Sequence, residues 1–306
     1  MENKQPLLSL CIPTNGKVEW MIPVIESIYA QGVDNTLFEV VVTDNGGKSD
    51  LTEAVKKYTY DNFHYYQTTS QGFTNQIDAF EKCNGVFCKM LNHRSKMMHG
   101  SIEEILKIVR KYQKKKPILY FAEGHAKGSE FIECANTDEF VESLSYWASW
   151  SCGTGVWKED LKTLRDKKVD NMFPHTVFLF NLRGETEYVV WNGKYEEMAD
   201  DAGKGGYDVF QTFGVGFLDL LSGLRIKKRI SQDTFIKVKR DLYGFLSSLY
   251  INEVLLPTKH TFIIQNVKQS MTIYYGPYYY HRMVCFAWIK AAIRRLKYII
   301  KRIIRH

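Results

Sequence analysis

The sequence predicts an α/β fold in which a mainly parallel sheet is sandwiched by helices and followed by a helical C-terminal region. Two observations support this prediction. Apolar, β-branched runs alternate with segments of helical periodicity as far as residue 122, and beyond residue 207 the pattern is mostly helical. Strands that alternate with helices form βαβ units, whose crossover helices cover both faces of a parallel sheet.

The predicted strands are short runs of apolar or β-branched residues bounded by polar turn residues. They span residues 7–13, 38–43, 64–68, 86–92 and 118–122. Ligands of such sheets bind at the carboxyl ends of the strands, so a site is expected in the loops that follow them.

The helices predicted between these strands have apolar residues at intervals of three and four. They span residues 21–31, 51–60, 72–83 and a segment that begins near Ser101. Asp50 is the expected N-cap of the second, and Ser101 with Glu103 and Glu104 marks the start of the last. Further along, helices are expected at 137–147, 174–181 and 207–256, and a Gly-broken strand or loop at 151–157.

The chain of 306 residues has a net charge of +7, but the excess lies at one end. Residues 281–306 carry eight Lys or Arg and no acid, which leaves residues 1–280 nearly neutral. A nucleic-acid-binding domain presents its basic surface on the body of the fold, so this class is disfavoured. The break at 200–206 divides an expected domain at 1–205 from a helical region at 206–280 and a basic tail helix at 281–306.

The six cysteines form no C-x-x-C pair, so the sequence predicts no zinc site and favours free thiols in a reducing cytoplasm. The N-terminus lacks the long apolar segment of a signal peptide. No apolar run reaches the roughly 18 residues of a membrane span. We therefore expect a cytoplasmic protein.

Motifs occupy four of the strand-end loops. They read CIPTNG at 11–16, TDNGGKSD at 43–50, QGFTNQ at 71–76 and LNHRSKMMHG at 91–100. In order and spacing they resemble the IPTYNR, SDNGSTD, xGFxxN and LGDDDxLxPG motifs of bacterial family 2 glycosyltransferases. The resemblance implies a GT-A fold with a Rossmann-like sheet, which transfers a sugar from a nucleotide-diphosphate donor, with UDP as the expected nucleotide.

The resemblance also assigns the donor site to residues of these loops. They are Pro13, Thr14, Asn15, Asp44, Asn45, Gly72, Asn75, Asn92, His93, Arg94 and Ser95. Asp44 is expected to accept the imide N–H of uracil, and Thr14 and Asn15 to meet the ring or the ribose. The glycines after Asn45 would let the backbone turn tightly against the ligand. Taken alone, residues 44–46 also suit a plain turn.

The metal-binding acids of the family are absent. Where the family has three acids, this sequence has His93, Arg94 and Ser95, whereas Mg²⁺ prefers carboxylate ligands. We therefore expect no metal and no required cofactor, with Arg94, assisted by Lys96 and His93, stabilising the diphosphate leaving group. Two alternatives stay open. The chain is a catalytically inactive subunit that binds glycan or a partner enzyme, or Arg94 is a solvated loop residue.

An inverting transferase needs a general base to take the proton of the acceptor hydroxyl. The family places an acid at a helix start in its second half, which corresponds here to the helix predicted at 174–181. His175 is the first candidate, since its ordinary pKa suits a base at neutral pH, and Asp170 is the second. Trp150 and Trp157 flank a Gly-rich stretch and are candidates for stacking on an acceptor sugar, with a place in the core as the alternative.

Apolar residues of the tail recur at helical spacing, with basic residues between them. They fall at 289, 293, 296, 299, 300, 303 and 304. The pattern predicts an amphipathic helix over 282–306 that contacts an anionic membrane surface. The alternative is a core-packed helix with a solvated basic face. Membrane contact would place the protein on the inner face of the cell membrane, beside a lipid-linked or polymeric surface-glycan acceptor.

Overall fold

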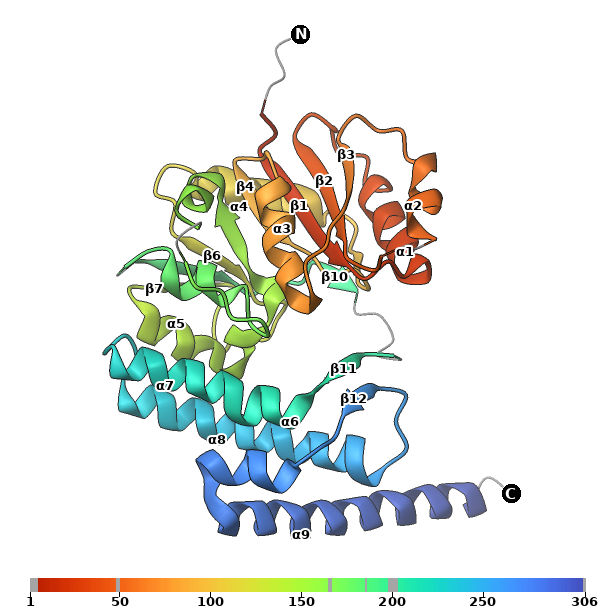
Figure 1. Cartoon of the computed structure of the whole chain (residues 1–306), viewed down its shortest axis with the longest axis vertical. Coiled ribbons are helices and arrows are strands. Elements are labelled where there is room, and N and C mark those ends of the chain that lie inside the picture. Colours follow the sequence, from red (N-terminus) through yellow and green to blue (C-terminus); the bar gives the residue numbers. More distant parts are fainter. Residues whose placement is uncertain (1–4, 48–49, 165–166, 185, 198–202, 305–306) are drawn as a thin grey trace. The chain divides into compact units, whose positions relative to one another are not determined.

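The computed structural model describes residues 5–47, 50–164, 167–184, 186–197 and 203–304, with the side chains of 297–299 and 301–304 excepted. The chain forms two compact units, residues 1–199 and 200–306, which are described separately (Figure 1). The division precedes the boundary expected after residue 205. Lys48 and Ser49 of the second motif and residues 200–202 of the expected break lie outside the described residues.

The first unit is built on a five-stranded sheet with the order β3-β2-β1-β4-β8. The strands are β1 (Leu8–Thr14), β2 (Phe38–Asp44), β3 (Phe63–Gln67), β4 (Phe87–Met90) and β8 (Gly155–Trp157). Neighbouring strands from β3 to β4 pair in parallel, and β8 pairs with β4 antiparallel. The predicted α/β class is confirmed, because this mainly parallel sheet carries helices on both faces.

Alternate residues of β1 separate the two faces of the sheet. Leu8, Leu10 and Ile12 belong to a cluster that contains the buried residues of two helices. Cys11 points into the opposite cluster with residues of a third. The helices on the first face are α1 (Val18–Tyr29) and α4 (Ser101–Tyr112), and α3 (Asn75–Lys82) lies on the second. This alternation is the period of two that a strand imposes.

Three of the predicted elements differ from the structure. The helix expected at 51–60 is only a turn, α2 (Leu51–Ala54), extended by the 3₁₀ turn Val55–Lys57. The strand expected at 118–122 is β6 (Ile118–Phe121), but it belongs to a second sheet with the order β6-β9-β7. The helix expected at 174–181 is a π-helical turn, Val177–Asn181, that begins after His175.

The remaining elements of the first unit are short. Strands β9 (Tyr188–Trp191) and β7 (Phe131–Cys134) complete the second sheet, and α5 (Thr137–Leu144) follows β7. Strands β5 (Lys96–Met97) and β10 (Glu196–Glu197) form an antiparallel pair. This pair matters for the site, because it anchors the loop that follows β4.

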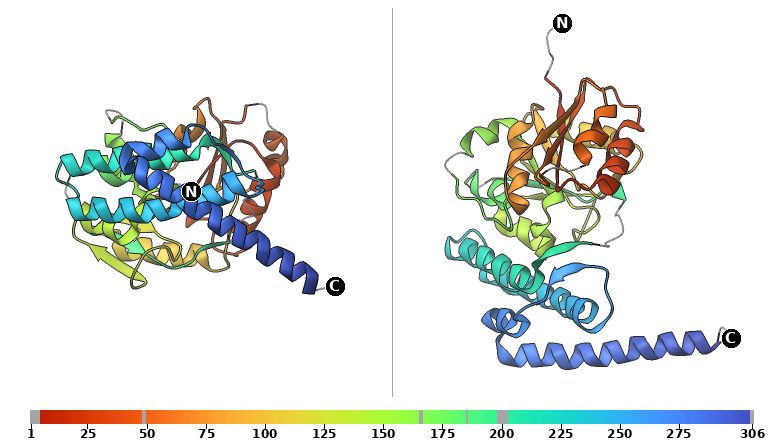
Figure 2. Two further views of the ribbon diagram at one scale, coloured as in Figure 1. Left: turned by 90° about the horizontal axis from the view of Figure 1, so that it is seen from below. Right: turned by 45° about the vertical axis from the view of Figure 1, so that its right-hand side comes forward.

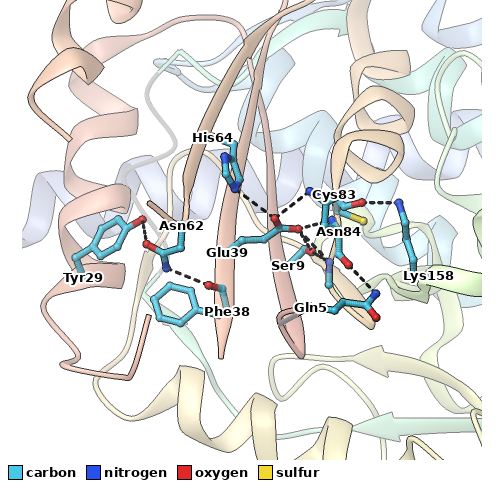
Figure 3. Close-up of polar contacts among 11 residues, drawn as sticks. Gln5, Ser9, Tyr29, Phe38, Glu39, Asn62, His64, Cys83, Asn84 and Lys158 are labelled. Carbon is cyan, nitrogen blue, oxygen red and sulfur yellow. Dashed lines mark hydrogen bonds and ion pairs between the residues drawn. The ribbon is translucent and has the colours of Figure 1, made fainter. Parts of the chain in front are cut away.

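A buried carboxylate ties together the starts of the central strands (Figure 3). Glu39 accepts hydrogen bonds from Ser9 Oγ at 2.5 Å and from the backbone N–H of Gly85 at 3.0 Å. His64 Nε2 lies 3.4 Å from the same carboxylate. Since Ser9 and Glu39 are the second residues of β1 and β2, this network lies at the end of the sheet opposite the strand-end loops and is structural.

The prediction that all cysteines are free is wrong for one pair. Cys83, directly after α3, and Cys88 in β4 form a disulfide, whereas Cys11, Cys134 and Cys152 are buried thiols. The turn from α3 into β4 brings the first two residues together across a separation of five residues. Sequence spacing alone does not reveal this, because it depends on how the helix enters the strand.

The second unit is mainly helical. Its elements are β11 (Gly205–Asp208), α6 (Val209–Gln211), the π-helical turn Thr212–Phe217, α7 (Leu218–Ile226), α8 (Gln232–Leu249), the π-helical turn Tyr250–Leu255, β12 (Thr261–Ile263) and α9 (Val267–Ile304). Leu218, Leu242 and Met271 are among its fully buried residues. Helix α9 bends at Gly276, whose φ is 76°. Its C-terminal part extends beyond the other helices of this unit (Figure 2).

One helical segment among the described residues is long and apolar enough to cross a membrane by length and composition. It is Val209–Ile226, with a mean hydropathy of 1.2, and half of it is buried inside the protein. The sequence analysis passed over this segment because polar residues such as Gln211, Asp219 and Arg225 interrupt its apolar run. Its buried half supplies core residues such as Phe210 and Leu221.

Candidate active site

The strand order makes the edge where β1 and β4 end a topological switch point. From β1 the chain passes to β2 and β3 on one side, then returns to β4 on the other side of β1. The strand order therefore reverses between β1 and β4, although the helices α1 and α4 that follow these strands lie on the same face of the sheet. Such a switch point is where open α/β sheets bind their ligands. Thr14 and the loop 92–95 border it.

One hydrogen bond connects the end of β1 to the loop after β4. Thr14 Oγ1 and His93 Nδ1 lie 2.9 Å apart. The Thr14 hydroxyl also accepts the backbone N–H of Gly16 at 3.2 Å. Burial and the neighbouring Arg94 charge lower the pKa of His93 to about 4, against a weaker opposing effect of Asp44. His93 is therefore a neutral imidazole at neutral pH.

The carboxylate of Asp44 shapes the loop after β2. Asp44 is buried, and its Oδ1 accepts the backbone N–H of Gly46 at 2.8 Å while Oδ2 accepts the Tyr65 hydroxyl at 2.7 Å. Gly46 lies so close to the loop after β1 that a Cβ there would be 2.2 Å from the carbonyl oxygen of Asn15. The turn interpretation of residues 44–46 holds here, because Asp44 fixes this turn directly against the loop after β1.

Asn75 and Asn45 hold the same loops together. Asn75 Nδ2 donates to the carbonyls of Thr14 at 3.2 Å and Thr43 at 2.8 Å. Asn45 Nδ2 donates to the carbonyl of Gly72 at 3.0 Å. In the structure Asn75 is buried and serves the backbone, so its expected direct contact with a donor is corrected to a supporting role. Pro13 lies within β1, and Asn15 is exposed on the loop after it.

The loop after β4 presents Arg94 on an aromatic platform. Asn92 Oδ1 accepts the backbone N–H of Arg94 at 3.0 Å, which closes a tight turn. The guanidinium carbon of Arg94 lies 4.1 Å from the centre of the Trp20 ring, and His93 meets the same indole edge-on at 5.2 Å. Sequence reasoning missed Trp20. Its position in the helix that starts directly after the first motif was the available signal.

Buried charges lie beneath this loop. Glu196 of β10 and Ser95 are both buried here, and burial raises the pKa of Glu196 against the opposing charge of Lys89. Lys89 is fully buried in β4, where its Nζ donates to the carbonyl of Met90 at 2.6 Å and to the Tyr195 hydroxyl at 3.2 Å. Ser95 therefore faces the protein interior, and its predicted place among the donor-binding residues is corrected accordingly.

His175 does not face an open site. It is 2% exposed, and burial lowers its pKa to about 4 despite the backbone of Ser149 and the charge of Asp170, which act in the opposite direction. So enclosed a ring cannot reach an acceptor hydroxyl, which corrects its interpretation as the general base. Asp170 is exposed, and its Oδ1 accepts the backbone N–H groups of Met172 and Phe173, both at 2.8 Å.

The two candidate acceptor tryptophans have different environments. Trp157 is 1% exposed, donates from Nε1 to the carbonyl of Pro117 at 2.7 Å and packs edge-on against Phe87. It is a core residue, so its predicted acceptor role is wrong. Trp150 is partly buried and lies beside a stacked pair that sequence reasoning missed, His125 on Trp147 with ring centres 3.5 Å apart.

The donor set at the family's metal position does not fit a divalent ion. The loop offers an imidazole hydrogen-bonded to Thr14, a guanidinium and a buried hydroxyl, without a carboxylate. Hard cations such as Mg²⁺ and Ca²⁺ take oxygen ligands, mainly carboxylates. A cation would also meet the charge of Arg94. We therefore assign no step of the chemistry to a metal.

The mainly parallel sheet and its flanking helices define a GT-A-like α/β fold, which similar solved structures share. The sequence matches no protein-family model and no curated protein. The similar structures include S. aureus TarS residues 1–349, at a TM-score of 0.53 and 14% identity over 79% of this chain and 71% of that chain.

The same TarS segment in complex with UDP-GlcNAc gives a TM-score of 0.57 at 14% identity, over 79% of this chain and 72% of that one. A longer TarS structure gives 0.52 at 15% identity, and there 79% of this chain matches 43% of that one. The similarity between this chain and these structures is therefore a similarity of fold.

Proposed function

We propose that this protein is an inverting glycosyltransferase that takes a sugar from a nucleotide-diphosphate donor, with UDP as the nucleotide. The observation that carries the proposal is the switch point between β1 and β4, where the guanidinium of Arg94 lies over the indole of Trp20. The TarS segment of similar fold has been solved with UDP-GlcNAc and with UDP, which supports the choice of donor.

The proposed reaction divides its tasks among the loops. The acceptor oxygen attacks the anomeric carbon while the bond from that carbon to the diphosphate oxygen breaks. Negative charge then develops on the leaving diphosphate, and the guanidinium of Arg94 stabilises it by paired N–H donors. The acceptor proton passes to a general base, for which Asp170 is the exposed candidate.

The loops after β1 and β2 would hold the nucleotide. Asn15 is exposed there, and the backbone of Gly46 lies directly against it. Asp44, through its bonds to Gly46 and Tyr65, keeps this wall in place. The acceptor is proposed to be a lipid-linked or polymeric surface glycan, with Trp150 and the His125–Trp147 stack as a platform for a sugar ring.

A thermal-shift screen tests the donor assignment. A ligand that binds only the native state raises the melting temperature by mass action, so UDP and UDP-sugars should shift it and adenine nucleotides should shift it less. If no nucleotide shifts the melting temperature and calorimetry is also silent, the donor site is wrongly assigned. Binding without any release of UDP in the presence of acceptors would instead favour the alternative, a catalytically inactive subunit that binds glycan or a partner enzyme.

A further inference from the structure

Within the second unit, helix α9 packs on the other elements by one narrow face. Beyond the bend at Gly276, the buried residues among those of α9 whose side chains the structure describes are Met283, Ala287 and Ala291, which recur at intervals of four. Side chains at that spacing lie on the same side of a helix. Two of the three are alanines, which let the helix approach its neighbours closely. The alternative prediction for the tail, a helix packed against the core, therefore describes this face of α9 only.

A second face of α9 is apolar and uncovered. Its residues recur at intervals of three and four, and they are Phe286, Ile289, Ile293, Leu296 and Ile300, with exposed fractions of 51, 59, 47, 58 and 45%. Trp288, which is 54% exposed, lies on another side of the helix. We call the five residues from Phe286 to Ile300 the apolar stripe. A contiguous patch of large apolar side chains on a surface marks an interaction site rather than a solvated helix.

A cationic pocket borders the apolar stripe between α8 and α9. It has a volume of about 220 Å³ and is lined by Tyr243, Gly244, Ser247, Ser248, Ile251, Arg282, Met283, Phe286 and Lys290. Two of these side chains, Arg282 and Lys290, are cations, and none of the lining residues is acidic. Phe286 belongs to both the pocket and the stripe, so an anionic group and an apolar chain can be bound side by side.

We propose that α9 docks this second unit on an anionic phospholipid membrane. The apolar stripe would lie at the boundary of headgroups and acyl chains, and the pocket would take the phosphate of a lipid headgroup. Interfacial helices combine an apolar face with Lys and Arg in this way, and a tryptophan suits the headgroup level. The proposal places the protein on the inner face of the cell membrane, and it is independent of the proposed catalytic activity.

The main competing occupant is a second copy of this chain. Intervals of three and four residues also form coiled-coil seams. Pairing two such stripes would, however, bring the basic flanks of both helices together, because residues 281–306 contain eight Lys or Arg and no acid. Like charges across a seam oppose association, whereas anionic lipids neutralise them. Charge complementarity therefore selects the membrane.

Vesicle flotation with the full chain tests the proposal. The protein should float with vesicles that contain phosphatidylglycerol and stay behind with phosphatidylcholine alone, and added salt should weaken the binding. R282Q/K290Q should reduce partitioning on the order of tenfold or more, at roughly fivefold for each charge near an anionic surface. I289S/I293S should abolish flotation without lowering the melting temperature, because both side chains are exposed.

A matched control is K227Q/K228Q, which removes two exposed charges of the same unit outside α9. Flotation should survive in this variant. If K227Q/K228Q loses as much flotation as R282Q/K290Q, the binding depends on net charge alone, and the proposed docking surface is wrong. A concentration-dependent dimer that I289S/I293S dissolves, seen by ultracentrifugation, would assign the stripe to a second copy. Stabilisation by inorganic phosphate without flotation would reassign the pocket to a free anion.

Discussion

Arg94 lies with its guanidinium carbon 4.1 Å from the centre of the Trp20 ring, so the loop after β4 and the start of α1 meet through a cation–π contact. Such a contact contributes about 0.5–2 kcal/mol, depending on how far it is desolvated. A stacked guanidinium keeps a fixed plane and presents its N–H groups along the edge, which is the geometry that matches a phosphate. Trp20 therefore orients Arg94 for the proposed leaving group.

Replacement of Arg94 by Ala should lower turnover by about a hundredfold or more, since a lost transition-state donor typically has that effect. Arg94→Lys should recover only part of the loss, because an ammonium group has neither the fork nor the planar stack. The measurement is UDP release at saturating donor. Arg110→Ala, an exposed charge on α4, is the matched control and should leave the rate unchanged. If Arg94→Ala also leaves the rate unchanged, Arg94 is a solvated loop residue without a role in the reaction.

Transfer should persist in the presence of a chelator. The loop at 93–95 offers no carboxylate, and a divalent ion there would meet the charge of Arg94. The experiment compares initial rates in EDTA with rates after Mg²⁺ or Mn²⁺ is restored. Abolition by EDTA and recovery with either metal would show that ligands from elsewhere in the chain bind an ion.

The sequence predicted the parts of the fold that depend on local pattern. The βαβ alternation predicted the parallel sheet, and the four motifs follow its strands as expected, because apolar periodicity and turn residues act over a few positions. The sequence pattern could not predict contacts between distant segments. Glu196 comes beside Met97 only through the pairing of β10 with β5, and His175 is buried by segments that no spacing relates to it.

Trp157 and Trp150 should respond differently to truncation. Trp157→Ala should cost about 3–5 kcal/mol of unfolding free energy, because it empties a core position against Phe87 and removes the bond to Pro117. Trp150→Ala should affect stability less and raise the KM for the acceptor more than that for the donor. Urea unfolding and steady-state kinetics of both variants check this. Equal acceptor defects in folded samples of the two would contradict the assignment of Trp157 to the core.

Buried neutral histidines should make the fold less stable as the solution becomes acidic. Burial lowers the pKa of both His93 and His175 from 6.5 to about 4. Between these values the unfolded chain binds more protons than the folded one, so the free energy of unfolding falls as pH decreases through this window. One pKa unit corresponds to about 1.4 kcal/mol, so each ring contributes on the order of a few kcal/mol near pH 7 that is lost toward pH 4.

The test compares urea unfolding at several pH values from neutral to mildly acidic. His175→Phe should flatten the dependence of unfolding free energy on pH whatever its effect on absolute stability, because the difference in proton binding is removed. His99→Asn is the control, since His99 is exposed on the loop before α4, and it should keep the slope of the unmodified protein. An unchanged slope in His175→Phe would mean that His175 accepts a proton in the folded state. In that case the ring is accessible, and its interpretation as the general base would have to be restored.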